Sequence, residues 1–245
     1  MSEKSNMNEI SPLRKYVKTK VEKDILNLEK AALEWIKISV KNRLVYEIDW
    51  LGIPIIQTPE EMILLQELIF TIKPDYIIET GIAHGGSIIY YASICQLIGK
   101  GEVIGIDIDI RKHNRRVIEK HNMFKRVKLI QGSSTNETTL KKVSEIVPKG
   151  STVLVCLDSN HTCDHVLSEL KLYKQFVSPG GYIVVFDTIT SRLASEGVCD
   201  KIYLNNGPSE AVEKFLKIDK DFEIDNKYDK LFITYSPKGF LRRIK

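Results

Sequence analysis

A glycine-rich turn between two apolar runs constrains this chain more than any other part of its sequence. The turn spans residues 79–87, reads Glu-Thr-Gly-Ile-Ala-His-Gly-Gly-Ser, and follows the apolar run 76–78. It opens a helix-like segment at 88–98, and a second apolar run, 103–106, then ends in Asp107. A strand, a glycine turn, a helix and a strand ending in an acid form the nucleotide-binding half of an open α/β sheet.

The glycine spacing indicates which nucleotide such a turn would hold. A dinucleotide site reads Gly-x-Gly-x-x-Gly, whereas this turn reads Glu-x-Gly-x-x-x-Gly. The latter order is typical of S-adenosylmethionine (SAM) sites, where no pyrophosphate has to be held. The alternative is an ordinary glycine turn that serves the fold alone. The residues predicted to bind SAM are Glu79, Gly81, Ala83, His84, Gly85, Gly86, Ser87, Asp107, Asp109, Ser133, Ser134 and Asp158.

Apolar runs and helical stripes alternate after residue 73, which predicts βα units. The expected strands are 76–79, 103–107, 127–131, 152–157 and 181–186, and the expected helices are 86–98, 112–121, 136–147, 162–174 and 209–218. Residues 222–224 and 231–235 are expected to close the chain as an antiparallel pair. The fold class is therefore α/β, a three-layer doubly wound Rossmann-like sheet that is mostly parallel with one antiparallel C-terminal strand.

The N-terminal quarter has a different character. Residues 21–40 carry a helical apolar stripe, residues 45–58 read as an ordered loop, and Pro59 is placed for the first turn of a helix to about Ile72. We therefore expect an N-terminal arm, helix and capping loop at 1–58 and the SAM-binding domain at 59–245. The polar residues 1–20 are expected to be mobile or to contact a neighbouring subunit.

Composition excludes several classes of function. The 36 basic and 32 acidic side chains of the 245 residues are interspersed and leave a net charge of +4, which argues against a nucleic-acid partner. No apolar run is long enough for a membrane span. The four cysteines have no paired spacing, so a reduced, cytoplasmic setting is expected. The basic segment 238–245 is interpreted as a solvated terminus.

Two aspartates end neighbouring strands of the predicted sheet. Asp158 ends the fourth strand and Asp187 ends the fifth, and adjacent strands lie about 4.8 Å apart. Such a pair suits Mg²⁺, which would lower the pKa of a substrate hydroxyl. The alternative is that both aspartates cap the helices that follow.

His161 and His165 lie four residues apart at the start of the next helix. His161, beside Asp158, is a candidate general base and Asp158 a candidate catalytic residue. A histidine pair that binds zinc would lack a third ligand at suitable spacing. A histidine that only shapes the loop is the remaining alternative, and His165 is expected to be structural.

Taken together, these segments resemble the cephalosporin hydroxylase-like and rhamnosyl O-methyltransferase group. The resemblance covers roughly residues 50–244 and is carried by Trp-Leu-Gly-Ile-Pro at 50–54, the glycine turn, Ile-Gly-Ile-Asp-Ile-Asp at 104–109, Gly-Ser-Ser-Thr at 132–135, Leu-Asp-Ser-Asn-His-Thr at 157–162 and Gly-Phe-Leu at 239–241. It implies a class I SAM fold and O-methyl transfer with Mg²⁺. By position, Asp107 would bind the ribose, and Asp158 and Asp187 the metal.

The chain departs from that group at two positions. Phe186 stands where the group often has an acid, and Cys163 stands where it often has a further histidine. The expected function is Mg²⁺-assisted O-methylation of a sugar hydroxyl, on a small-molecule, sugar-nucleotide or glycan substrate, by a homo-oligomer. The alternatives are an NAD-dependent oxidoreductase on the same fold and a non-catalytic SAM-binding scaffold.

Overall fold

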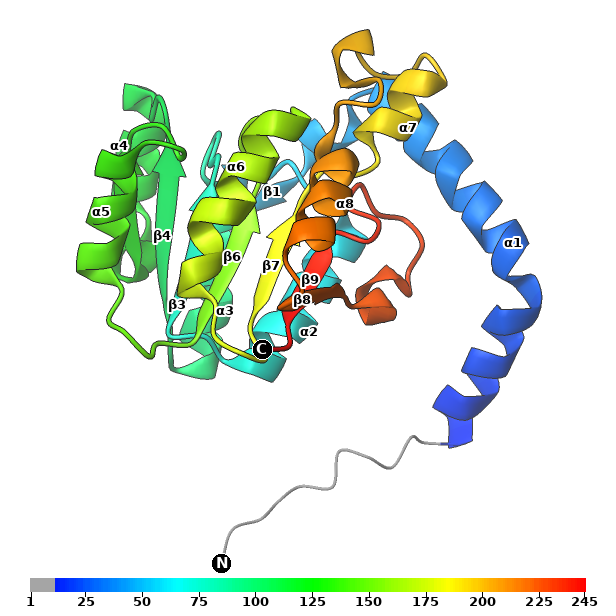
Figure 1. The fold of residues 1–245 in the computed structure, drawn as a ribbon, viewed down its shortest axis with the longest axis horizontal. Helices are drawn as coiled ribbons and strands as arrows, with labels where there is room; N and C mark the ends of the chain where they lie inside the picture. The colour runs from blue at the N-terminus through cyan, green and yellow to red at the C-terminus, as the bar shows by residue number, and fades with distance from the viewer. Residues whose placement is uncertain (1–11) are drawn as a thin grey trace, which may run out of the picture.

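A seven-stranded sheet covered by helices on both faces forms the body of the molecule (Figure 1). The structure is a computed structural model and describes residues 12–245. Its α-helices are α1 (Pro12–Lys41), α2 (Pro59–Ile72), α3 (Gly86–Ile98), α4 (Lys112–Lys120), α5 (Glu137–Ile146), α6 (Cys163–Tyr173), α7 (Thr190–Ser195) and α8 (Pro208–Ile218). The strands are β1 (Asp49–Trp50), β2 (Ile53–Pro54), β3 (Tyr76–Thr80), β4 (Glu102–Asp107), β5 (Val127–Gln131), β6 (Val153–Leu157), β7 (Tyr182–Val185), β8 (Phe222–Ile224) and β9 (Phe240–Arg243).

The strand order of the large sheet is β5-β4-β3-β6-β7-β9-β8. The first five strands are mutually parallel, and β9 runs antiparallel to both β7 and β8. The doubly wound fold with one antiparallel C-terminal strand is thus confirmed. The order reverses between β3 and β6, and ligands of such sheets bind beside that switch point, at the carboxyl ends of the strands.

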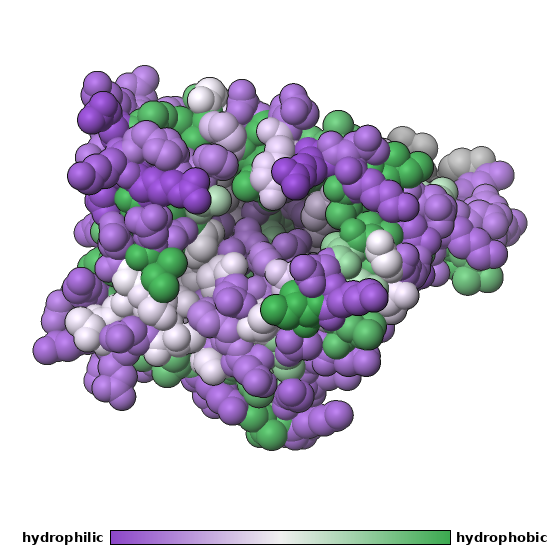
Figure 2. All heavy atoms as spheres, turned by 90° about the horizontal axis from the view of Figure 1, so that it is seen from above, coloured by the Kyte–Doolittle hydropathy of each residue, from purple (hydrophilic) through white to green (hydrophobic). Residues whose placement is uncertain are grey.

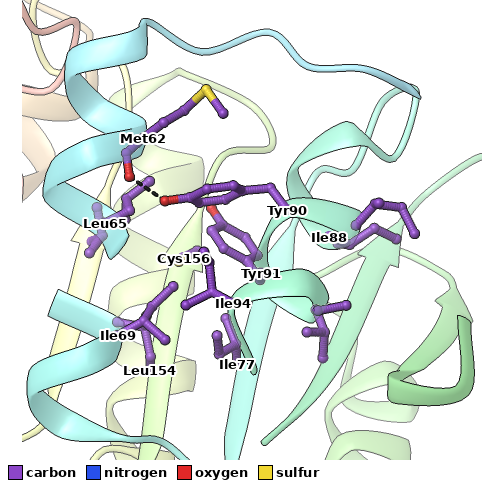
Figure 3. Packing of buried hydrophobic residues seen from close by; sticks show 14 of the residues in the cluster. Met62, Leu65, Ile69, Ile77, Ile88, Tyr90, Tyr91, Ile94, Leu154 and Cys156 are labelled. Carbon is purple, nitrogen blue, oxygen red and sulfur yellow. Dashed lines mark hydrogen bonds between the residues drawn. The ribbon is translucent and has the colours of Figure 1, made fainter. Parts of the chain in front are cut away.

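Two apolar layers hold the helices against the sheet. Alternate residues of each strand face opposite layers, so that Ile77 packs with α2 and α3 whereas Ile78 packs with α5, α6 and α8. Figure 3 shows the first layer, in which Tyr90 and Tyr91 of α3 lie against α2. The Tyr90 hydroxyl donates a hydrogen bond to the carbonyl of Met62, which satisfies the polar end of this buried ring.

The C-terminal strand lies elsewhere than the sequence indicated. Residues 231–235 form no strand, and the partner of β8 is β9 at 240–243. The prediction that 238–245 is a solvated terminus is also wrong, because Phe240 and Leu241 are buried between β7 and β8. The segment 231–235 instead crosses the carboxyl edge of the sheet, where it contacts the site described below.

The N-terminal helix is longer than predicted and stands away from the sheet at one side of the molecule (Figure 1). Its C-terminal half packs through Ala32 and Ile36, whereas residues 22–31 are all exposed. Residues 12–20, expected to be a mobile arm, belong to this helix, and residues 1–11 lie outside the described part of the chain. Among residues 12–245, no helix combines the length and apolarity required to span a bilayer.

Candidate active site

A cavity of about 350 Å³ opens at the carboxyl edge of the sheet, beside the switch point. Figure 2 looks onto this edge and shows the face hollowed near its centre, among mainly hydrophilic residues. The parallel register brings the ends of β3, β6 and β7 side by side, with Thr80 opposite Leu157 and Leu157 opposite Val185. The residues that follow these ends, including Gly81, Asp158 and Asp187, therefore line one space.

The glycine turn forms one wall of this cavity. Gly81 has φ +82°, and a Cβ there would lie 2.1 Å from the carbonyl oxygen of Asp158. Gly86 is equally confined, since a Cβ would lie 2.2 Å from the carbonyl oxygen of Pro54. Only glycine allows this close approach of three backbone segments. Ala83, His84 and Ser87 line the same wall, as the sequence predicted for a ligand-facing turn.

Asp107 tethers the turn from the next strand. Its Oδ2 accepts hydrogen bonds from the backbone N–H groups of Ile82 (3.0 Å) and Ala83 (3.3 Å). Its Oδ1 accepts one from the N–H of Asp109 (3.0 Å). Asp107 borders a second cavity of about 600 Å³, and both aspartates border a third of about 300 Å³.

The second cavity brings together the residues after β5 and the start of α6. Ser133, Ser134, Ser159 and His165 line it. His165 Nε2 lies 3.0 Å from Ser159 Oγ and 3.2 Å from Ser134 Oγ. The N-cap of α5 is Asn136, whose side chain accepts a hydrogen bond from the N–H of Thr138.

Two of the predicted cofactor residues, Glu79 and Gly85, face the interior of the protein. Glu79 is fully buried and accepts a hydrogen bond from Ser87 Oγ (2.6 Å). Burial raises the pKa of Glu79 to about 8. A Cβ on Gly85 would meet the side chain of Ile118 on α4. Neither residue is among those that line the three cavities at this edge.

Asp158, His161 and Asp187 form a cluster in which one ligand atom of each lies within 4.8 Å of the others. His161 Nε2 is 3.2 Å from Asp187 Oδ2. Burial raises the pKa of Asp158 well above its ordinary value, and the neighbouring charges of Asp187 and Glu79 raise it further. A cation between the aspartates would relieve this repulsion.

The alternative that Asp158 and Asp187 cap the helices that follow them is wrong. The N-cap of α6 is Thr162 and that of α7 is Ile189. Asp187 has φ +56°, a left-handed conformation that costs of order 1–3 kcal/mol for a non-glycine residue and is concentrated at functional sites. The donor set fits Mg²⁺, since it offers carboxylate oxygens from two neighbouring strand ends within 4.8 Å of each other.

Residues outside the strand ends also line this cavity. They include Val40 at the end of α1, Tyr46 of the 3-10 helix Leu44–Glu47, Ile56 after β2 and Leu193 of α7. The long polar segment 188–208 contains α7 and a 3-10 helix at Lys201–Tyr203. Glu61 also faces this cavity, although Thr58-x-x-Glu61 in the sequence predicts only the start of a helix.

Known proteins share both the sequence pattern and the fold. The family described as Rhamnosyl O-methyltransferase/CmcI matches residues 42–244 of this chain. The rhamnosyl O-methyltransferase of Mycobacterium bovis (strain BCG / Pasteur 1173P2) is 28% identical over 202 residues, which cover 79% of this chain and 77% of that protein. The rhamnosyl O-methyltransferase of Mycobacterium leprae (strain TN) is 28% identical over 198 residues, covering 79% and 82%.

Solved structures show the same fold at lower identity. A CmcI structure with Mg and SAM aligns with a TM-score of 0.59 and 18% identity, covering 82% of this chain and 78% of that chain. The O-methyltransferase TomG from Streptomyces achromogenes, in complex with SAM, aligns with a TM-score of 0.52 and 16% identity, covering 67% and 70%. Since the family match spans the glycine turn, both aspartates and the last strand, this chain belongs to the rhamnosyl O-methyltransferase/CmcI family.

Proposed function

We propose that this protein transfers the methyl group of SAM to a hydroxyl of a sugar. The observation that carries the proposal is the contact between the glycine turn and the acidic cluster, since the missing side chain of Gly81 faces the backbone of Asp158. A donor held on the turn and an acceptor held at the cluster would therefore meet in one cavity. The family relatives are rhamnosyl O-methyltransferases, which supports a sugar as the acceptor class.

The cofactor would lie along the glycine turn and extend into the second cavity. SAM supplies an electrophilic methyl group on a positively charged sulfur. Asp107, Ser133 and Ser134, which line the second cavity, would bind its ribose and adenine. Gly81, Ala83 and His84, which line the first, would bind its amino-acid end. Glu79 would act indirectly, by holding Ser87 and the base of the turn. Fixing both reactants in line contributes about 7–11 kcal/mol to such a transfer.

The acceptor hydroxyl has to lose its proton near Asp158 and Asp187. When bound by these two carboxylates, Mg²⁺ supplies charge that lowers the pKa of the hydroxyl. His161 would take the proton, and Asp187, 3.2 Å away, would orient the imidazole and stabilise its charged form. Imidazole nitrogen is a poorer ligand for Mg²⁺ than oxygen, which leaves His161 free for proton transfer.

Neither alternative function is favoured. An NAD-dependent oxidoreductase needs a turn that holds a pyrophosphate, and the family relatives are methyltransferases. A non-catalytic scaffold would not require a histidine beside two carboxylates inside a cavity that adjoins the turn.

We also propose that the protein works as a homo-oligomer in the cytoplasm. The apolar stripe of α1 that packs through Ala32 and Ile36 continues through Val21, Ile25 and Leu28, and among residues 12–245 Ile25 and Leu28 remain 40% and 38% exposed. A second copy of the chain would cover this stripe. All four cysteines are free thiols, in accord with a reducing compartment.

Two measurements test the main proposal. Calorimetry should detect binding of the demethylated product of SAM, and Asp107→Ala should weaken it about tenfold or more because the turn loses hydrogen bonds to a charged group. Asp164→Ala, at an exposed position of α6, should bind normally. Mass spectrometry after incubation with SAM, Mg²⁺ and a panel of sugars should reveal a methylated product. Absence of binding to the wild-type protein would rule out the assignment.

A further inference from the structure

Glu61 is a buried carboxylate at the cavity that the chemistry above does not use. It is the third residue of α2 and is 2% exposed. Its Oε2 accepts a hydrogen bond from Thr58 Oγ1 (3.2 Å), as part of the helix cap. Its Oε1 accepts two more, from Thr234 Oγ1 (2.8 Å) and from the backbone N–H of Tyr235 (2.9 Å). Helix capping does not require this second set of bonds, which reaches 173 residues along the chain.

The segment that Glu61 holds is the one that fixes Asp187. The N–H of Asp187 donates to Ser236 Oγ (3.3 Å), and the N–H of Ile189 donates to the carbonyl of Tyr235 (3.0 Å). Thr188 Oγ1 donates to the carbonyl of Pro237 (2.6 Å). Residues 187–189 are thus bound along their whole length to residues 235–237.

Ser236 lies at the centre of this arrangement. Its own N–H donates to Thr234 Oγ1 (2.9 Å), and its side chain is fully buried. Thr234 in turn donates to Glu61 Oε1. Hydrogen bonds therefore link the backbone of Asp187 to Ser236, Ser236 to Thr234, and Thr234 to Glu61.

The backbone of Asp187 needs such support. Its φ of +56° is unfavourable for a residue with a side chain, so the surroundings have to impose it. We infer that Glu61 is a positioning residue that holds Asp187 in its ligand geometry through Ser236, and thereby sets the metal affinity of the site. The inference rests on the proposed function, in which Asp158 and Asp187 hold a divalent cation.

The test is a double-mutant cycle read out by metal binding. Mn²⁺ replaces Mg²⁺, because its binding can be followed by electron paramagnetic resonance in the full-length protein without any substrate. Glu61→Gln and Ser236→Ala should each weaken Mn²⁺ binding about tenfold or more, as is typical when a partner of a metal ligand is lost. The double variant should bind Mn²⁺ with the same affinity as the single variant that binds it less tightly, because both substitutions break the same chain of hydrogen bonds.

A matched control separates positioning from general stability. Glu67 lies on the same helix as Glu61 and forms an exposed ion pair with Lys230. The control variant Glu67→Gln removes this ion pair and should leave the Mn²⁺ affinity unchanged. Binding of the demethylated cofactor without metal should stay within about twofold of wild type in both test variants, since the glycine turn is untouched.

The outcomes distinguish the inference from the proposal beneath it. If the wild-type protein binds no Mn²⁺, or if Asp187→Asn binds it equally well, the proposed metal site is wrong. If the wild type binds Mn²⁺ and Ser236→Ala binds it with the same affinity, the positioning role is wrong. A loss in Glu61→Gln alone would also overturn it, because that pattern indicates the lost negative charge rather than the hydrogen-bond chain. Ser236→Ala does not change the charge of the site. It therefore tests the positioning role even if Glu61→Gln fails to fold.

Discussion

His161 Nε2 lies 3.2 Å from Asp187 Oδ2, although the two residues follow different strands of the sheet. The pair combines a proton acceptor with a carboxylate that can orient it. The same carboxylate faces Asp158 across the space where a cation would bind. One side chain is therefore placed to serve both the base and the metal.

This shared role predicts different defects for the two partners. His161→Ala should lower turnover by about 10²- to 10⁴-fold, the usual contribution of a positioned base, while Mn²⁺ and cofactor still bind. Asp187→Asn should lose turnover and Mn²⁺ binding together. Steady-state kinetics and metal titration on the same preparations check this. Equal loss of metal binding in both variants would make His161 a ligand instead.

Two glycines with nearly the same φ offer a matched comparison. Gly81 has φ +82° and a Cβ would collide with Asp158 and Ser159, whereas Gly99 has φ +81° and nothing within 4 Å. Gly99→Ala should cost roughly 1–2 kcal/mol of unfolding free energy from the left-handed conformation alone. Gly81→Ala should cost more and should abolish cofactor binding. Chemical denaturation and calorimetry give the two numbers, and equal effects would exclude the close packing described for the turn.

The buried Glu79 predicts a dependence of stability on pH. Its pKa is about 8 in the folded protein against an ordinary value of 4.5. Between these two pKa values, folded Glu79 keeps a proton that unfolded Glu79 loses. The stabilisation that results from this difference is fully present below pH 4.5 and is lost as the pH rises to about 8. The slope is at most about 1.4 kcal/mol per pH unit.

Glu79→Gln removes this titration while keeping an acceptor for Ser87. The free energy of unfolding of wild type relative to Glu79→Gln should therefore fall between pH 5.5 and pH 7.5, measured by urea denaturation without cofactor. A constant difference between the two proteins would mean that Glu79 does not take up a proton on folding.

The exposed stripe of α1 predicts an assembly. Ile25→Asp combined with Leu28→Asp should convert the protein to monomers in light scattering, because charge replaces the apolar surface that a second copy would cover. Leu26→Asp, which is 68% exposed but lies off the stripe, should assemble like wild type. A wild-type protein that is monomeric at all concentrations would exclude the proposed oligomer.

The parallel half of the sheet could be predicted because each strand is a short apolar run followed by a turn and a helical pattern. The last strand could not. Residues 231–235, Leu-Phe-Ile-Thr-Tyr, have strong β propensity, yet Phe232 adopts φ +63° and Thr234 binds Glu61. Tertiary hydrogen bonds thus override the local preference. Gly239 directly precedes β9, and a Cβ there would lie 2.2 Å from the carbonyl oxygen of Val185. This position requires glycine because of a contact with a distant strand, and no local pattern reveals that contact.

The candidate site divides in the same way. The glycine turn, Asp107, Asp158 and Asp187 could be expected to meet because the ends of parallel strands share one edge. Glu61 could not, since its position at the cavity depends on α2 packing against segments far away in the sequence. Periodicity predicts which face of a helix is buried, and says nothing of which distant loop that face contacts.

The acidic lining of the cavity has a consequence for the end of the catalytic cycle. Glu61, Asp158 and Asp187 face this space, and Arg43 is the one lysine or arginine among its lining residues in the described chain. Transfer of the methyl group abolishes the positive charge on sulfur, so the attraction of these carboxylates for the cofactor drops at that moment. The acidic lining therefore favours the charged donor over its neutral product.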